Sequence, residues 1–215
     1  MSKPERFFSI GVDIGQKVDH SAIALTEELP KSAIVRLLVK YPLGTPWPLL
    51  TQTVADLVKS IKEKGTIYHF SVDATGPGSA PSQMIQEALP DIRVDAFIFT
   101  NRSKRELVGK VKVMHSYGRL KLATRKGDEV YNRTLSELIT EMKQLQAKVI
   151  REDSTSPEIE IFKTGAHDDL FTALALSVKD IEFARGDKDI LFVEDKSWVQ
   201  TGLEERQEPT VLFTT

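Results

Sequence analysis

The chain has 215 residues and a formal net charge of −2 at pH 7, with 40% hydrophobic and 28% charged residues. This composition is ordinary for a globular protein, and the length suffices for one well-buried domain with a small appendage. The absence of cysteine excludes a disulfide framework and a thiolate zinc site. No apolar run approaches the roughly 18 residues of a membrane span, and the N-terminus lacks a signal-peptide core, so we expect a soluble, intracellular protein without membrane contact.

The first half of the chain alternates between strand and helix patterns. Residues 7–13, 21–25 and 33–41 read as three strands with short connections, which predicts an antiparallel meander. An apolar stripe that includes Val54 and Ile61 then predicts a helix ending near Gly65. Residues 66–72 form the next predicted strand, which leads directly into a glycine-containing loop.

The second half begins with a helix opened by Pro81 and a strand over 94–99. Ser103 and Glu106 have the spacing of a capping box and predict the start of a further helix. Later segments are an amphipathic helix around 135–145, hairpin strands over 148–152 and 158–163 with a polar tip at 153–157, and a helix over 170–183.

This order predicts an α/β fold. A three-strand antiparallel meander followed by alternating helices and strands gives a mixed sheet with helices on both faces, here with a long auxiliary β-hairpin. From Gly186 onward the periodicity weakens. We therefore expect one domain over 1–185 and a partly ordered C-terminal tail over 186–215.

Three short acidic motifs stand at the ends of predicted elements. Asp13 and Asp73 end strands in Gly11-Val-Asp13-Ile-Gly15 and Ser71-Val-Asp73-Ala-Thr-Gly76, and Asp168 and Asp169 open the last helix in Gly165-Ala-His-Asp-Asp-Leu170. A carboxylate at the end of a buried strand needs a partner. If the fold brings these groups together, they can hold two hard divalent cations, which activate water and stabilise the leaving oxygen of a phosphodiester.

Each motif also has a simpler explanation. Asp13 and Asp73 can be turn residues beside glycines, and an aspartate before an apolar helix is most often an N-cap. Two adjacent aspartates exceed what capping requires, so one can cap while the other binds metal, or each can bind one ion. His167 can orient a ligand or a water from behind the metal ligands, or it can be purely structural.

A basic segment suggests a nucleic-acid surface. Between Arg102 and Lys126 the chain carries nine lysine and arginine residues against one acid, Glu106. A local basic stripe on a mildly acidic protein is typical of a surface that follows a phosphate backbone, although a solvated helix face gives the same pattern. The candidate DNA contacts are Lys17, Arg102, Lys104, Arg105, Lys110 and Lys112.

Other chemistries have poor support. The GxSxG spacing of a nucleophile elbow is missing around Ser79, and no GxxxxGK[ST] phosphate loop occurs. Gly11 to Gly15 is also similar to the first phosphate loop of the actin and sugar-kinase superfamily. Those proteins have two lobes, and their later glycine-rich loop would fall where this chain has His167, Asp168 and Asp169.

The ordered set of motifs, with the hairpin before the last aspartates, resembles the nuclease domain of the tailed-bacteriophage terminase large subunit over roughly residues 5–185. The resemblance implies a ribonuclease H-like fold in which Asp13, Asp73 and one or both of Asp168 and Asp169 bind Mg²⁺ or Mn²⁺. It implies endonucleolytic cleavage of concatemeric double-stranded DNA with little sequence preference, in the cytoplasm of the host cell.

The resemblance also implies partners. The parent protein would contain an ATPase domain and would work with the portal and the small terminase subunit, the hairpin would control access of DNA, and the tail would dock on the portal or a neighbouring subunit. The chain has no ATPase motif, so either it corresponds to an excised domain or the implied role in packaging does not apply to it. A Holliday-junction resolvase of the same fold is the alternative, and a fragment of an actin-like nucleotide-binding protein is a more distant one.

Overall fold

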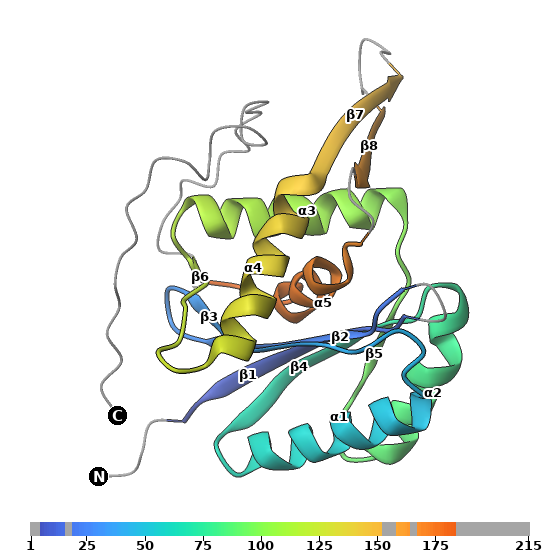
Figure 1. Ribbon diagram of the computed structural model, residues 1–215, viewed down its shortest axis with the longest axis vertical. Coiled ribbons are helices and arrows are strands. Elements are labelled where there is room, and N and C mark those ends of the chain that lie inside the picture. The colour runs from blue at the N-terminus through green and yellow to red at the C-terminus, as the bar shows by residue number, and fades with distance from the viewer. Residues whose placement is uncertain (1–4, 16–18, 152–157, 164–166, 184–215) are drawn as a thin grey trace.

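Three consecutive strands form the N-terminal half of the sheet, as predicted. β1 (Phe7–Asp13) pairs antiparallel with β2 (Ala22–Glu28), and β2 pairs antiparallel with β3 (Ala33–Lys40). The fold is seen in a computed structural model (Figure 1). It describes residues 5–15, 19–151, 158–163 and 167–183.

Three further strands extend this meander into a mixed sheet. β4 (Thr66–Asp73) lies parallel to β1, and β5 (Asp95–Phe97) lies parallel to β4. The two-residue strand β6 (Leu120–Lys121), which was not predicted, pairs parallel with β3. The strand order is β5-β4-β1-β2-β3-β6, so the predicted mixed sheet is confirmed.

Helices cover both faces of this sheet, also as predicted (Figure 1). α1 (Trp47–Lys62) and α2 (Ser79–Ala88) lie on one face. α3 (Asn101–Ser116), α4 (Glu129–Gln144) and α5 (Asp169–Val178) lie on the other. Each layer has its own apolar core, because alternate residues of β1 and β2 point to opposite faces.

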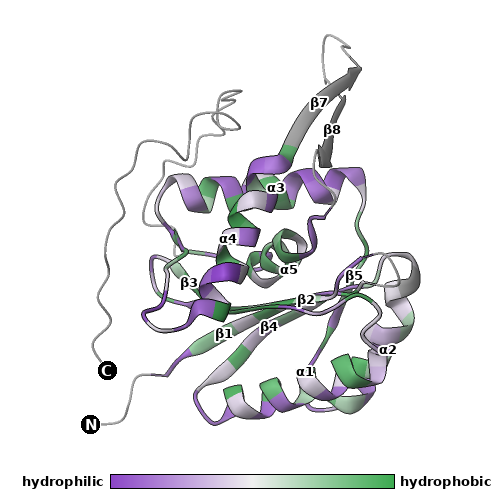
Figure 2. Cartoon of the chain, viewed as in Figure 1, coloured by the Kyte–Doolittle hydropathy of each residue, from purple (hydrophilic) through white to green (hydrophobic). Residues whose placement is uncertain are grey.

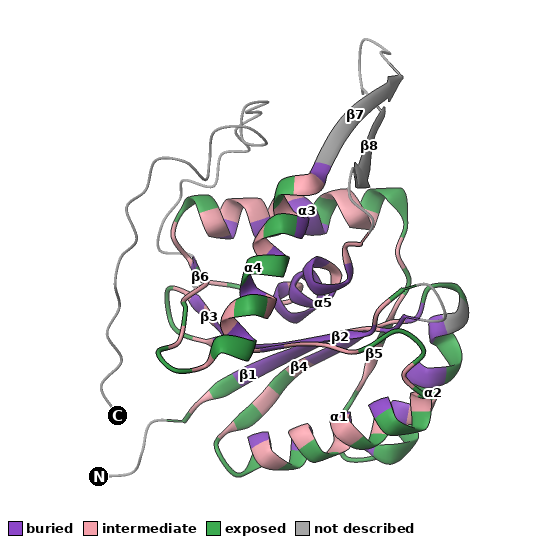
Figure 3. Ribbon diagram, in the orientation of Figure 1, coloured by how far each residue is buried: buried purple, intermediate pink, exposed green. Residues whose placement is uncertain are grey.

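The helix α5 is the central element of the second layer. It is almost entirely apolar, and Figure 3 shows it buried between the sheet and the helices α3 and α4. Small residues of the sheet let it approach closely. A Cβ atom on Gly11 would lie 2.0 Å from the carbonyl oxygen of Ala173 and 2.4 Å from the backbone nitrogen of Ser177. Gly11 therefore fixes the position of α5 over β1.

A separate two-stranded sheet follows α4 directly. β7 (Leu145–Arg151) pairs antiparallel with β8 (Glu158–Lys163), so the predicted hairpin is confirmed and begins three residues earlier than expected. It projects beyond the main sheet on the side of α3 (Figure 1). The predicted polar tip at 153–157 and the predicted tail at 186–215 lie outside the described residues.

Several predicted boundaries were wrong. The strand expected over 94–99 is only the three residues of β5, and the helix expected over 170–183 ends at Val178. The helix expected to start at Pro81 starts at Ser79, after a single 3-10 turn over Gly76–Gly78. These differences arise because hydrophobic patterns mark the middle of an element better than its ends.

The capping box of α3 was assigned to the wrong residues. Thr100 is the N-cap, its side chain accepts from the backbone N–H of Ser103, and the Ser103 hydroxyl accepts from the N–H of Thr100. Glu106 instead accepts from Arg102 at 2.9 Å on the exposed surface. Within the described residues, no helix is long and apolar enough to cross a membrane.

Candidate metal centre

The parallel pairing of β1 and β4 brings Asp13 and Asp73 together. Val12 is opposite Val72 in the register, so the next residue of each strand is an aspartate at the same carboxyl edge. The two carboxyl groups lie within hydrogen-bonding reach of each other. The backbone N–H of Thr75 donates to Asp73 Oδ1 at 2.8 Å and fixes that side chain at the start of the glycine-containing loop.

The close approach of α5 adds the second pair of aspartates. Gly11 contacts the turn of α5 that contains Ala173. Asp13 lies two residues further along the same face of β1, and Asp169 lies one helical turn before Ala173. Both steps lead toward the same edge of the sheet, so Asp169 and Asp168 approach Asp13 there.

Negative charges accumulate at this edge. Burial raises the pKa of Asp13 well above its ordinary value, and the nearby charges of Asp73, Asp169 and Asp168 raise it further. Burial also raises the pKa of Asp169, against the opposing effect of Lys40. Four carboxylates from three elements thus lie together, which is an environment that a divalent cation stabilises.

The N-terminus of α5 does not use Asp168 as its cap in the expected way. Asp168 occupies the N-cap position, but its side chain makes no capping hydrogen bond. Its Oδ2 atom instead accepts from Lys104 Nζ at 3.0 Å, which ties α3 to α5. Asp168 therefore occupies the cap position without the side-chain hydrogen bond of a typical cap, and its carboxylate contacts the Lys104 ammonium group.

A compact group of possible ligands surrounds Asp169. Ligand atoms of Asp19, His167 and Asp169 all lie within 4.8 Å of one another, the one such set of three among the described residues. His167 Nδ1 lies 3.6 Å from Asp169 Oδ2, and both atoms are buried without a hydrogen-bond partner in the described part of the chain. The His167 ring also packs edge-on against His20, whose Nδ1 contacts the carbonyl oxygen of Tyr41. Unsatisfied buried acceptors at a carboxylate cluster fit a bound cation.

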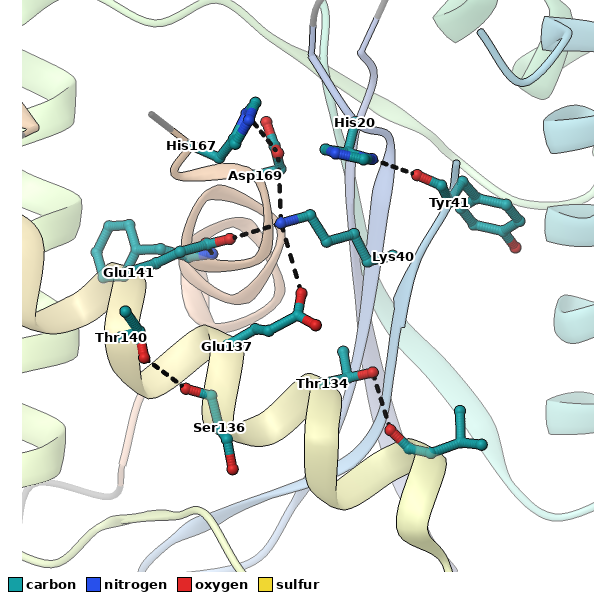
Figure 4. A network of polar contacts seen from close by, with 12 residues as sticks. His20, Lys40, Tyr41, Thr134, Ser136, Glu137, Thr140, Glu141, His167 and Asp169 are labelled. Carbon is teal, nitrogen blue, oxygen red and sulfur yellow. Dashed lines mark hydrogen bonds and ion pairs between the residues drawn. The ribbon is translucent and has the colours of Figure 1, made fainter. Parts of the chain in front are cut away.

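The sequence prediction missed a network behind Asp169. Lys40, at the end of β3, lies 3.3 Å from Glu141, 3.6 Å from Glu137 and 3.9 Å from Asp169 (Figure 4). One signal was available, since Glu141 falls on the apolar stripe of α4, after Leu138, where an acid is unexpected.

The basic stripe separates into different environments on α3, whose polar residues are visible in Figure 2. Arg102 is exposed and pairs with Glu106, whereas Lys104 contacts Asp168 at the acidic cluster. Lys110 donates to the carbonyl oxygen of Lys179, and its burial lowers its pKa, so it serves the contact between α3 and α5. Arg105 and Lys112 are half-buried on the same helix, and Lys17 lies outside the described residues.

The sheet is mixed, begins with an antiparallel meander and has helices on both faces. This architecture, with the acidic cluster at the edge formed by β1, β4 and α5, is a ribonuclease H-like fold. Solved structures of this fold agree. The nuclease domain of the large terminase from Thermus phage P74-26 is 16% identical, with a TM-score of 0.60 over 85% of this chain and 84% of that one.

Two further similar structures were determined with metals. The large terminase nuclease from thermophilic phage G20c with bound magnesium is 18% identical, with a TM-score of 0.58 over 84% of each chain. The human cytomegalovirus terminase nuclease domain soaked with manganese is 11% identical, with a TM-score of 0.53 over 80% of this chain and 82% of that one. No family model and no curated protein matches the sequence. The predicted resemblance to terminase nuclease domains is thus confirmed in the fold.

Proposed function

We propose that this chain is a metal-dependent endonuclease domain of a phage DNA-packaging terminase, which hydrolyses phosphodiester bonds of concatemeric double-stranded DNA with little sequence specificity. The observation that carries the proposal is the convergence of Asp13, Asp73, Asp168 and Asp169 at one sheet edge. The fold supports it, because the similar solved structures are terminase nuclease domains, one with magnesium and one soaked with manganese.

We assign the carboxylates to two ions. In this proposal Asp13 and Asp73, whose side chains interact, hold one ion, and Asp169, His167 and Asp19, whose ligand atoms lie within 4.8 Å of one another, hold the other. Carboxylate oxygens suit Mg²⁺ and Mn²⁺, and an imidazole ligand favours Mn²⁺ over Mg²⁺. When bound, such ions polarise the phosphate and lower the pKa of a coordinated water.

The side chains of this chain have distinct roles in the proposed reaction. Asp13, held by its neighbours on β1 and by α5, is the central ligand because all three other aspartates act on it. Lys104 at 3.0 Å from Asp168 orients that carboxylate and places a positive charge beside the DNA phosphate. The rigid support of α5 by the sheet keeps the ligands of the last motif in place.

The proposed DNA path follows α3 toward the acidic cluster. This helix carries Arg102, Arg105 and Lys112. It also carries Lys104, which contacts Asp168 at the cluster. The backbone of β8 lies beside α3, so the hairpin borders the same path. In the proposed setting the chain acts in the cytoplasm of an infected cell, together with an ATPase domain, the portal and the small terminase subunit.

Plasmid cleavage tests the proposal. We expect nicking and linearisation of supercoiled DNA with Mg²⁺ or Mn²⁺, but not with EDTA, and loss of both products in Asp73→Asn. Asparagine keeps an oxygen that can accept from Thr75 N–H and removes only the charge. Asp56→Asn is the matched control, since Asp56 is exposed on α1 in the opposite layer.

Three outcomes would change the conclusion. Cleavage that persists in Asp73→Asn would show that the acidic cluster does not take part in the reaction. Absence of cleavage with any metal would show that the chain is not a nuclease. Strong preference for a four-way junction over linear duplex would instead support a resolvase.

A further inference from the structure

The first turn of α5 has a cap that comes from another helix. The first N–H groups of a helix have no partners within it. Asp168 does not cap them with its side chain, but Oε2 of Glu141 accepts from the backbone N–H of Phe171 at 2.9 Å. Phe171 is the third residue of α5, where an N-cap side chain would normally bond. Glu141 of α4 therefore supplies the capping hydrogen bond that the Asp168 side chain does not make.

The position of Glu141 is unusual for an acid. Its residue is 5% exposed and lies on the apolar stripe of α4. A buried carboxylate is costly unless its oxygens are hydrogen-bonded and its charge is balanced. Both oxygens of Glu141 are used, because Oε2 contacts α5 and Oε1 accepts from Lys40 Nζ at 3.3 Å.

Lys40 extends this connection to the acidic cluster. Its Nζ atom lies 3.9 Å from Asp169 Oδ2, which has no hydrogen-bond partner among the described residues. Figure 4 shows Lys40 between Glu141, Glu137 and Asp169. Glu141 thus acts on Asp169 in two ways, through the backbone of α5 and through the Lys40 ammonium group.

We propose that Glu141 and Lys40 form a positioning pair that sets the metal affinity of the acidic cluster, by holding the start of α5 and the Asp169 carboxylate in the orientation that receives a cation. The inference rests on the proposed metal-dependent function. Outer partners that orient metal ligands typically change metal affinity by about 10- to 100-fold. Glu141 is a positioning residue in this scheme and does not touch the metal.

The measurement is Mn²⁺ binding to the full chain by calorimetry, with circular dichroism to verify folding of each variant. We expect Glu141→Ala to weaken Mn²⁺ binding by about 10-fold or more, because it removes both connections. Glu141→Gln keeps an acceptor for Phe171 N–H but loses the charge that anchors Lys40, so we expect partial rescue. Glu137→Gln is the matched control, since Glu137 contacts the same Lys40 but is 47% exposed and does not cap α5.

Cleavage as a function of Mn²⁺ concentration gives a second readout. A positioning role predicts that Glu141→Ala raises the Mn²⁺ concentration needed for half-maximal cleavage and leaves the rate at saturating Mn²⁺ close to wild type. A merely structural role would lower the rate at every concentration. If Glu141→Ala does not fold, Glu141→Gln carries the test, and wild-type affinity in that variant would overturn the pair.

Two results overturn the inference in different ways. The positioning pair is rejected if a folded Glu141→Ala variant binds Mn²⁺ with wild-type affinity, or if Glu137→Gln weakens Mn²⁺ binding as much as Glu141→Ala does. Either result leaves the nuclease proposal unchanged. Failure of the wild-type chain to bind Mn²⁺ at all removes the proposed metal-dependent function, and the inference with it.

Discussion

At the scale of single residues, the central feature is the carboxyl group of Asp13. Its pKa is raised above the ordinary value of 3.8 by burial first and then by Asp73, Asp169 and Asp168. A raised pKa means that the folded chain holds the Asp13 proton more tightly than the unfolded chain does. The protonated Asp13 carboxyl group therefore stabilises the metal-free fold. This stabilisation is complete below pH 3.8 and is lost as the pH rises through the raised pKa of Asp13.

We therefore predict that Asp13→Asn stabilises the metal-free chain at about pH 8. Asparagine resembles protonated Asp13, because its amide can donate to Asp73, and it removes one charge from the cluster. In EDTA, the melting temperature of the variant should match wild type near about pH 4 and exceed it increasingly toward about pH 8. Added Mn²⁺ should stabilise wild type more than the variant. A uniform decrease in melting temperature at every pH would contradict an electrostatic role for Asp13.

At the scale of elements, the contact between α5 and β1 brings the aspartates of the site together. Asp168 and Asp169 follow Asp73 by more than 90 residues of sequence, and the packing of α5 on β1 brings them to Asp13. The contact depends on Gly11, whose missing side chain gives space to the backbone of α5. A hydrogen bond of 2.8 Å between the hydroxyl groups of Thr26 and Ser177 holds the other end of the helix on β2.

Gly11→Ala should push α5 away from the sheet. We expect it to lower the free energy of unfolding by about 1–3 kcal/mol, as overpacking does, and to weaken Mn²⁺ binding because Asp168 and Asp169 move. The measurement is chemical denaturation together with Mn²⁺ calorimetry. Gly109→Ala on α3 is the control, because nothing lies within 4 Å of its added Cβ. That substitution should raise stability by about 0.5–1 kcal/mol.

At the scale of the whole molecule, the layer formed by α3, α4 and α5 carries the proposed active face. The acidic cluster, the basic residues of α3 and the backbone of β8 lie in this layer, whereas α1 and α2 only close the opposite core. The charge of the chain is nearly balanced overall, so the proposed interaction with DNA depends on this local arrangement.

The double variant Arg105→Ala with Lys112→Ala should weaken duplex binding. Each of these two side chains that neutralises a phosphate contributes about 0.9 to the slope of log affinity against log salt. Removing it should reduce the slope by that amount, with little effect on metal binding. The measurement is DNA affinity in Ca²⁺ between low and moderate salt. Lys59→Ala with Lys62→Ala removes the same charge from exposed positions on α1, and an equal change there would reject α3 as the DNA surface.

The local pattern of the sequence was enough to predict the order of elements and the resemblance in fold. The strand-ending aspartates are visible because a carboxylate at the end of a buried strand needs a partner, and the apolar run of α5 is unmistakable. The exact start of α3 could not be predicted, because Ser103 and Glu106 have the same capping-box spacing as Thr100 and Ser103. Lys110 was assigned to DNA on charge alone, although its ammonium group supports α5.

Periodicity and residue type were therefore enough to predict the α/β architecture, the hairpin and the four aspartates as candidate ligands. The tertiary structure decided which groups act on those aspartates. Glu141 caps a helix through a backbone N–H 30 residues away, and Lys40 reaches Asp169 from a strand more than 120 residues earlier. Such pairings depend on how helices pack on the sheet, and no local sequence pattern records that packing.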